Sequence, residues 1–236
     1  MVDGFSTGCQ YRLFHPFSDK GLYTMIHIYY HTGTLTESQF RYHLQSLPLS
    51  IQQKITSFKK KQDAERSLMG KVLLQKALSD HGRSTDLDAI TYTEAGKPFI
   101  DPSAHFSISH SGDYTVCALG SSGRIGIDIE KIRAIPIREL KDYFTPSDWQ
   151  QILGSNDSEK ELIFMWTRKE ALLKAIGAEY SLGFPSVASN QLAWKDSQWF
   201  FRTINLDDLY ACHLCVENSL PDIVVEEYKF SLGVGG

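Results

Sequence analysis

The chain has 236 residues, enough for one large domain or two modest ones with a buried core. Hydrophobic residues make up 42% and charged residues 22%, close to globular averages, which excludes a disordered or low-complexity chain. The formal net charge of −4 disfavours a nucleic-acid-binding protein. We expect a soluble, cytoplasmic protein, because no apolar run approaches the ~20 residues of a membrane span, no signal peptide is evident, and four scattered cysteines make no disulfide framework.

The first half of the chain predicts one strand, three helices and further strands. Residues 1–23 are mixed and poorly periodic, and we expect an N-terminal extension there. A strand is predicted at 25–30, and helical spacing of apolar residues predicts a long helix over 62–81. Two shorter helices are predicted at 36–47 and 50–58, strands at 89–93, 104–109 and 114–119, and a turn at 96–98.

The second half repeats this order. Small residues at 120–123 predict a junction, and isoleucines alternating with polar residues over 124–132 predict a half-buried strand. Helices are predicted at 137–144, 146–153 and 158–176, and strands over the last sixty residues, one of which would place Cys212 and Cys215 on opposite faces. The pattern Lys71-x-x-Leu74-x-Lys76-Ala77 recurs as Lys169-x-x-Leu172-x-Lys174-Ala175, which favours an internal duplication.

Three acidic residues form a candidate metal site. Asp128 and Glu130 lie two apart on the predicted strand, so both carboxylates project to one face of it. Glu170 lies in the predicted helix 158–176, with Lys174 following at i,i+4. Magnesium sites use a few carboxylates and leave the other positions to water and substrate phosphates. Taken singly, Asp128 and Glu130 fit a solvated strand face better than a metal site, and Glu170 fits an ordinary surface ion pair with Lys174 better.

Candidate phosphate contacts lie upstream of the acidic residues. Ser109 and His110, at the end of a strand, can donate to phosphate oxygens or can serve a turn. Lys97 in the turn 96–98 is either a phosphate contact or an exposed lysine. The basic residues between 59 and 71 suit a phosphate-rich small molecule or a solvated helix face. The chain carries no P-loop, dinucleotide-binding or hydrolase-type nucleophile motif.

Four motifs occur in order within residues 96–175: Gly96-Lys97-Pro98, Phe106-Ser107-Ile108-Ser109-His110-Ser111, Gly126-Ile127-Asp128-Ile129-Glu130, and Trp166-Thr167-Arg168-Lys169-Glu170-x-x-x-Lys174-Ala175. Together they resemble the motif set of the Sfp-type 4′-phosphopantetheinyl transferases. The resemblance implies an α+β fold of two similar α/β subdomains about a pseudo-twofold axis, with the active site in the cleft between them. The N-terminal subdomain, 24–121, is expected to bind coenzyme A, and the C-terminal subdomain, 122–236, to carry the metal-binding and catalytic residues.

The resemblance also assigns roles by position. It implies that Asp128, Glu130 and Glu170 ligate Mg²⁺ beside the donor pyrophosphate. Glu170, directly or through a metal-bound water, is then the candidate base, and Lys174 stabilises developing charge. The positions matching contacts to the donor's phosphates, or flanking the metal site, are Arg66, Lys97, Ser109, His110, Lys169 and Lys174. Ser107 departs from the family pattern, which commonly has asparagine there.

The implied reaction transfers the 4′-phosphopantetheine arm of coenzyme A to a serine of an apo carrier protein and releases 3′,5′-ADP. A monomer with no nucleic-acid or membrane partner is expected. The carrier protein is expected to contact an apolar patch within 133–153, comprising Ile135, Ile137, Tyr143, Phe144 and Trp149, of which Tyr143 and Phe144 fit the core better.

Two alternative functions use the same residues. A Mg²⁺-dependent hydrolase would cleave a pyrophosphate bond in coenzyme A with water as the nucleophile. A non-catalytic module would bind a carrier protein or coenzyme A. The second alternative is disfavoured because all three acidic positions and Lys174 are intact.

Overall fold

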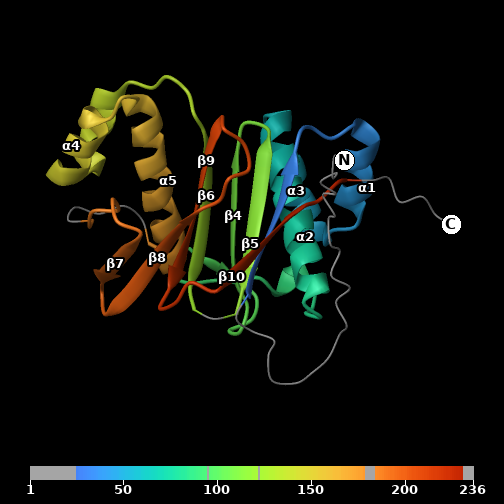
Figure 1. Cartoon of the computed structure of the whole chain (residues 1–236). Helices are drawn as coiled ribbons and strands as arrows, with labels where there is room; N and C mark the ends of the chain where they lie inside the picture. The colour runs from blue at the N-terminus through green and yellow to red at the C-terminus, as the bar shows by residue number, and fades with distance from the viewer. Residues whose placement is uncertain (1–24, 95, 122, 179–183, 231–236) are drawn as a thin grey trace, which may run out of the picture.

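A computed structural model of the chain describes residues 25–94, 96–121, 123–178 and 184–230. Two four-stranded sheets form its centre, and helices cover the outer face of each, so that the layers run helix, sheet, sheet, helix (Figure 1). The predicted α+β fold class is confirmed. The predicted N-terminal extension, residues 1–23, lies outside the described residues.

The elements follow the predicted order. The first half contains β1 (Met25–Thr32), α1 (Glu37–Gln45), α2 (Leu49–Thr56), α3 (Lys61–Asp80), the 3₁₀ helix η1 (Leu87–Ala89), β2 (Thr91–Tyr92), β3 (Pro98–Phe99), β4 (His105–Ser111) and β5 (Tyr114–Gly120). The second half contains β6 (Ile125–Lys131), the 3₁₀ helix η2 (Ile137–Tyr143), α4 (Pro146–Gly154), α5 (Ser158–Ile176), β7 (Gln191–Trp194), β8 (Ser197–Thr203), β9 (Tyr210–Glu217) and β10 (Asp222–Glu227).

Local side-chain chemistry sets several of these boundaries. Thr36 caps α1 in a reciprocal capping box, and Thr145 accepts a hydrogen bond from the Asp148 amide at the start of α4. The strand predicted at 89–93 is only β2, because η1 forms just before it with Asp86 as its cap. The helix predicted at 137–144 is 3₁₀ rather than α, since none of its residues is buried and its N-terminus has no side-chain cap.

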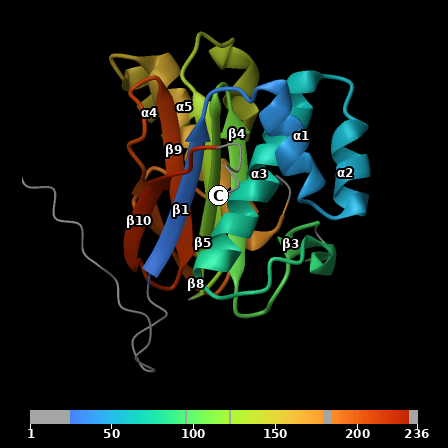
Figure 2. The ribbon, with the colours of Figure 1, turned by 90° about the vertical axis from the view of Figure 1, so that its right-hand side faces the viewer.

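The two sheets repeat one topology. The first has the strand order β10-β1-β5-β4 and the second β6-β9-β8-β7. In each, three neighbouring strands run antiparallel, β1-β5-β4 in the first and β6-β9-β8 in the second. The long helices α3 and α5 cover the corresponding faces, as the rotated view also shows for α3 (Figure 2). This arrangement supports the internal duplication that the repeated sequence pattern predicts.

One strand crosses the predicted subdomain boundary. β10 follows the second repeat in the chain but pairs in parallel with β1 at the edge of the first sheet. The subdomain boundary near residue 121 remains a prediction. β10 follows this boundary in the sequence, but in the fold it belongs to the first sheet.

The central core forms where the sheets face one another. Ile125, Ile127 and Ile129 of β6 are all buried against residues of the first sheet, including Ile28 and Val116. Fully burying one such side chain contributes about 1.5–3 kcal/mol. The alternation along β6 therefore directs its isoleucines inward and leaves Asp128 and Glu130 on the opposite face, as predicted.

The described cysteines all lie in the buried core. Cys212 belongs to the core between the sheets, whereas Cys215 belongs to the core beneath α5, so the two thiols face opposite sides of β9. Cys117, Cys212 and Cys215 are free and buried. Within the part of the chain that the structure describes, none of the helices combines the length and the apolar character required to cross a bilayer.

Candidate active site

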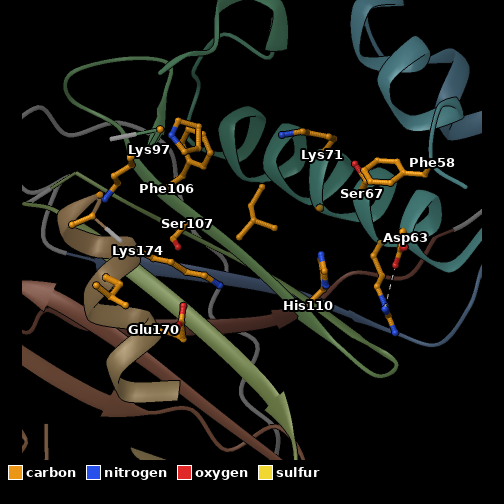
Figure 3. Close-up of a pocket in the computed structure, with 18 residues that line it drawn as sticks. Phe58, Asp63, Ser67, Lys71, Lys97, Phe106, Ser107, His110, Glu170 and Lys174 are labelled. Carbon is orange, nitrogen blue, oxygen red and sulfur yellow. Dashed lines mark ion pairs between the residues drawn. The ribbon is translucent and has the colours of Figure 1, made fainter. Parts of the chain in front are cut away.

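A cavity of about 750 Å³ opens between α3 and α5, above the line where β4 meets β6 (Figure 3). It therefore lies between the two repeats. Arg66, Ser67 and Lys71 line it from α3, and Glu170 and Lys174 line it from α5. Further lining residues come from α3 and its neighbouring loop, the turn before β3, β4 and the end of α5: Phe58, Asp63, Gly70, Gly96, Lys97, Pro98, Phe106, Ser107, Ile108, His110, Leu173, Gly177 and Ala178.

A glycine brings α5 against β6. A Cβ atom built on Gly126 would lie 2.0 Å from the carbonyl oxygen of Ala171 and 2.5 Å from the amide nitrogen of Ala175. Only a residue without a side chain permits this contact between helix and strand backbones. The approach places Glu170 and Lys174 of the helix beside Asp128 of the strand, two residues after the glycine.

Three serines join the two sheets where their edge strands meet. The backbone amides of Ile127, Ile129 and Lys131 donate to the hydroxyls of Ser107, Ser109 and Ser111, at 3.0, 3.4 and 3.1 Å. Side-chain oxygens of β4 thus satisfy the amides on the outer edge of β6. Ser107 is one of these three serines, and its hydroxyl accepts a hydrogen bond from the Ile127 amide. The family that the sequence resembles commonly has asparagine at this position.

The serine hydroxyls also hold the two carboxylates of β6. Ser109 donates to Asp128 Oδ1 at 2.8 Å, and Ser111 donates to Glu130 Oε2 at 2.6 Å. Lys174 Nζ donates to the same Asp128 oxygen at 2.7 Å and to the Ser109 hydroxyl at 2.8 Å. A strand, its neighbour and a helix therefore converge on Asp128.

The electrostatics favour a cation between the acidic residues. The pKa of Glu170 is raised by burial first and then by the charges of Asp128 and Glu130, and the pKa of Glu130 is raised by burial and by Asp128. Lys174 opposes both shifts. The second oxygen of Asp128, Oδ2, is buried without a hydrogen-bond partner in the described part of the chain. An unsatisfied carboxylate oxygen at this position can accept a hydrogen bond or bind a metal ion.

The acidic residues do not form a complete metal cage. Among the residues described, no group of three or more His, Cys, Asp and Glu side chains lies in an arrangement that could hold a metal ion. Magnesium does not require such a cage, because it retains several waters and binds through one or two carboxylates together with substrate phosphates. The donor set of Asp128 and Glu130, with Glu170 nearby, fits that mode of binding.

Basic residues line the cavity on the side opposite Glu170 and Lys174. Arg66 donates to the carbonyl oxygen of Gly112 at 3.0 Å and lies 3.8 Å from Asp63. His110 lines the cavity, and its pKa is lowered first by the partial shielding of its ring from solvent and then by the charge of Arg66. Lys71, which the sequence placed only in a basic stretch, also lines the cavity, and burial lowers its pKa. The spacing of 63, 66, 67, 70 and 71 is that of one helix face and could have identified this wall.

Lys97 links the two repeats. It lines the cavity, but its ammonium donates to the carbonyl oxygens of Ile125, at 3.1 Å, and Ala175, at 2.6 Å. Burial lowers the pKa of Lys97 to about 8. Ala175 lies in the last turn of α5, where carbonyl groups lack helical partners and attract a cation.

The structure does not bring Lys169 to the cavity. Its side chain is buried between α5 and η2, donates to the carbonyl oxygen of Tyr143, and lies 4.8 Å from the ring centre of Phe144 and 5.1 Å from that of Phe184. Burial lowers the pKa of Lys169 to about 8. Ser109, Asp128 and Glu130 also lie at the junction of β4 and β6 rather than in the cavity wall, whereas Arg66, Lys97, His110, Glu170 and Lys174 do line the cavity.

The segment expected to contact a carrier protein is mostly packed against α5. Phe144 belongs to the core, and Ile135, Ile137 and Trp149 are partly buried against it. Tyr143 is 37% exposed and Leu153, on α4, is 58% exposed. The apolar surface that this segment offers is therefore smaller than its sequence indicates.

Comparisons with known proteins cover both repeats. Residues 124–231 match the model of the 4′-phosphopantetheinyl transferase superfamily, and residues 34–122 match the model described as 4′-phosphopantetheinyl transferase, N-terminal. The chain is 33% identical over 193 residues to the 4′-phosphopantetheinyl transferase Sfp of Bacillus subtilis (strain 168), covering 75% of this chain and 86% of that protein. It is 32% identical over 177 residues to another Bacillus subtilis 4′-phosphopantetheinyl transferase, covering 69% and 79%.

A solved structure gives only a partial match. The holo-[acyl-carrier-protein] synthase of Thermotoga maritima superposes with a TM-score of 0.30 at 18% identity, over 40% of this chain and 62% of that one.

The fold, with a cavity lined by Arg66, Lys71 and Lys174 beside the acidic residues, is that of a transferase whose site suits a phosphate-bearing substrate. The chain belongs to the 4′-phosphopantetheinyl transferase superfamily. The predicted family, the enzyme class and the transfer of phosphopantetheine from coenzyme A to a carrier protein are confirmed at this level.

Proposed function

We propose that the chain transfers the 4′-phosphopantetheine arm of coenzyme A to a carrier-protein serine in a Mg²⁺-dependent reaction that releases 3′,5′-ADP. The observation that carries the proposal is the convergence of Asp128 and Glu130 from β6 with Glu170 and Lys174 from α5, the last two of which line the cavity. Basic residues from α3 and β4 line the opposite side of the cavity and suit a donor rich in phosphate.

In this proposal Asp128 and Glu130 hold the magnesium ion, with Glu170 as the third acidic contributor. The bound ion would withdraw charge from the oxygens of the donor pyrophosphate. Arg66, Lys71 and His110 supply positive charge and hydrogen-bond donors for the donor's phosphates.

The proposed chemistry is a displacement at phosphorus. The serine oxygen of the carrier protein bonds to the phosphorus on the pantetheine side, and the bond from that phosphorus to the leaving 3′,5′-ADP breaks. Glu170 takes the serine proton as the general base. The ammonium of Lys174 lies beside this site and neutralises charge that develops on the phosphate oxygens.

The remaining finer assignments are proposals of the same kind. The N-terminal repeat supplies the basic wall that would bind coenzyme A, and the C-terminal repeat supplies Glu170 and Lys174 to the opposite wall, with Asp128 and Glu130 beside them. A monomer is proposed because one chain contributes both walls. A cytoplasmic location is proposed because the described cysteines are free thiols.

The test incubates the protein with coenzyme A, Mg²⁺ and a panel of apo carrier proteins, and detects the pantetheine adduct by mass spectrometry. Asp128→Ala and Glu170→Ala should each lower the rate more than 100-fold, and EDTA should stop transfer. Cys212→Ser is the control, because this thiol lies in the core between the sheets and does not line the cavity, so the variant should retain transfer. Full transfer by either carboxylate variant would refute the site.

A further inference from the structure

Ser111 makes two directed hydrogen bonds at the junction of β4 and β6. Its hydroxyl accepts the backbone N–H of Lys131 at 3.1 Å and donates to Glu130 Oε2 at 2.6 Å. A serine hydroxyl has one proton, and the amide of Lys131 occupies its acceptor side. The remaining proton is therefore directed at the carboxylate of Glu130, and its orientation is set by the backbone rather than by solvent.

The register between the strands makes this contact part of a series. Serines at every second position of β4 meet amides at every second position of β6. Two of the three serines also donate to an acidic side chain, Ser109 to Asp128 and Ser111 to Glu130. Ser107 accepts an amide in the same way but lies opposite the stretch of β6 that begins at Gly126, which has no side chain. Ser109 and Ser111 therefore each contact a carboxylate and Ser107 does not, so the two kinds of contact can be compared within one junction.

Glu130 has a particular need for such a contact. Asp128 is 4% exposed and is held by both Ser109 and Lys174. Glu130 is only half buried, and its longer side chain has more rotamers to lose when it binds a metal ion. A hydrogen bond that selects one orientation before binding reduces this loss, as partners of metal ligands generally do.

We propose that Ser111 is a positioning residue that fixes the Glu130 carboxylate in the orientation in which it ligates the divalent cation. The proposal rests on the proposed metal site and deepens it by naming a residue that acts through a ligand without touching the ion or the substrate. The serine is thus selected for its hydroxyl and for its register opposite Glu130.

The test measures the affinity of the protein for Mn²⁺ by electron paramagnetic resonance, with no donor or carrier protein present. Ser111→Ala should weaken Mn²⁺ binding about tenfold, the lower end of the range for removing a ligand's hydrogen-bond partner. Ser111→Thr, which keeps the hydroxyl, should restore the affinity, and Ser111→Val, which has the shape of threonine without the hydroxyl, should not. This isosteric pair separates the hydrogen bond from packing even if the alanine variant folds poorly.

Ser107→Ala provides the matched control. It removes an equivalent contact between β4 and β6, so it should lower the melting temperature while leaving Mn²⁺ affinity within about twofold of wild type. Equal affinities for the threonine and valine variants would overturn the proposal, as would an equal loss in Ser107→Ala. Asp128→Ala and Glu130→Ala test the metal site itself. If neither weakened Mn²⁺ binding, the metal site and this proposal would both be wrong, whereas their success with an unaffected Ser111→Val would reject Ser111 alone.

Discussion

Replacing Gly126 by alanine should damage both stability and catalysis through the position of α5. The added Cβ would lie 2.0 Å from the Ala171 carbonyl oxygen, whereas real Cβ contacts are essentially never shorter than 3.0 Å. The helix must therefore withdraw by about 1 Å, because both contacting atoms belong to its backbone and no side chain can rotate away. Overpacking of this kind costs about 1–3 kcal/mol, and the rigidity of both partners puts Gly126→Ala near the upper end.

The same shift moves Glu170 and Lys174 away from β6. A misplacement of about 1 Å in catalytic groups can cost about 100-fold in rate, so we expect a loss of that order in transfer. A destabilisation of about 3 kcal/mol corresponds to a fall in Tm of about 6–12 °C in a chain of this size. Both are measured on one preparation, by calorimetry and by the mass-spectrometric transfer assay.

Gly154→Ala controls for the substitution itself. Gly154 ends α4, and a Cβ built there has no heavy atom within 4 Å. This variant should keep its transfer rate and should be as stable as wild type or slightly more so. The reasoning fails if Gly126→Ala melts within 2 °C of wild type and transfers at the wild-type rate, because the close approach of α5 would then be dispensable.

Two further predictions concern charged residues outside the acidic site. Lys169→Met should shift the Tm, because the Tyr143 carbonyl oxygen loses a hydrogen-bond donor. The variant should change the KM for coenzyme A by less than about twofold. A tenfold rise in steady-state KM would show instead that Lys169 reaches coenzyme A. Hydrogen bonds from Arg124 lower the pKa of Glu217 from its ordinary 4.5 to about 2. This ion pair should therefore stabilise the fold above about pH 4.5 and lose its effect as the pH falls toward 2. Glu217→Gln should flatten urea-unfolding stability over that pH window, and an unchanged pH profile would count against the pairing.

The directions of Asp128, Glu130 and Glu170 could be predicted from the local sequence pattern. Alternation along residues 124–132 separated Asp128 and Glu130 from the isoleucines, and the strand has that arrangement. Helical periodicity likewise placed Glu170 and Lys174 together, since residues four apart lie about 40° apart around a helix. Both results depend only on the period of one element, which neighbouring residues along the chain determine.

The motif could not predict the direction in which the Lys169 side chain points. Lys169 and Glu170 are adjacent in sequence, but successive residues on a helix are about 100° apart. When Glu170 faces the cavity, Lys169 must point toward η2 and Phe184. A resemblance that treats the two residues as one motif carries no information about this rotation.

The serine junction was hidden for a different reason. Strand alternation places Ser107, Ser109 and Ser111 on one face of β4, but nothing local shows that the edge of a second sheet lies opposite. The role of Lys97 between the carbonyl oxygens of Ile125 and Ala175 has the same origin. Contacts between residues distant in sequence decide both, and a single sequence does not contain them in readable form.

The parallel pairing of β1 with β10 affects the order in which the protein can fold during synthesis. β1 is the first strand described and β10 the last, so one neighbour of β1 leaves the ribosome only after all the other described strands have been made. Until then, the backbone of β1 from Met25 to Tyr30 is exposed along the edge that β10 later covers. The nascent first repeat therefore keeps one unpaired strand edge until β10 is made, even though its helices and the pairing of β1 with β5 can form earlier.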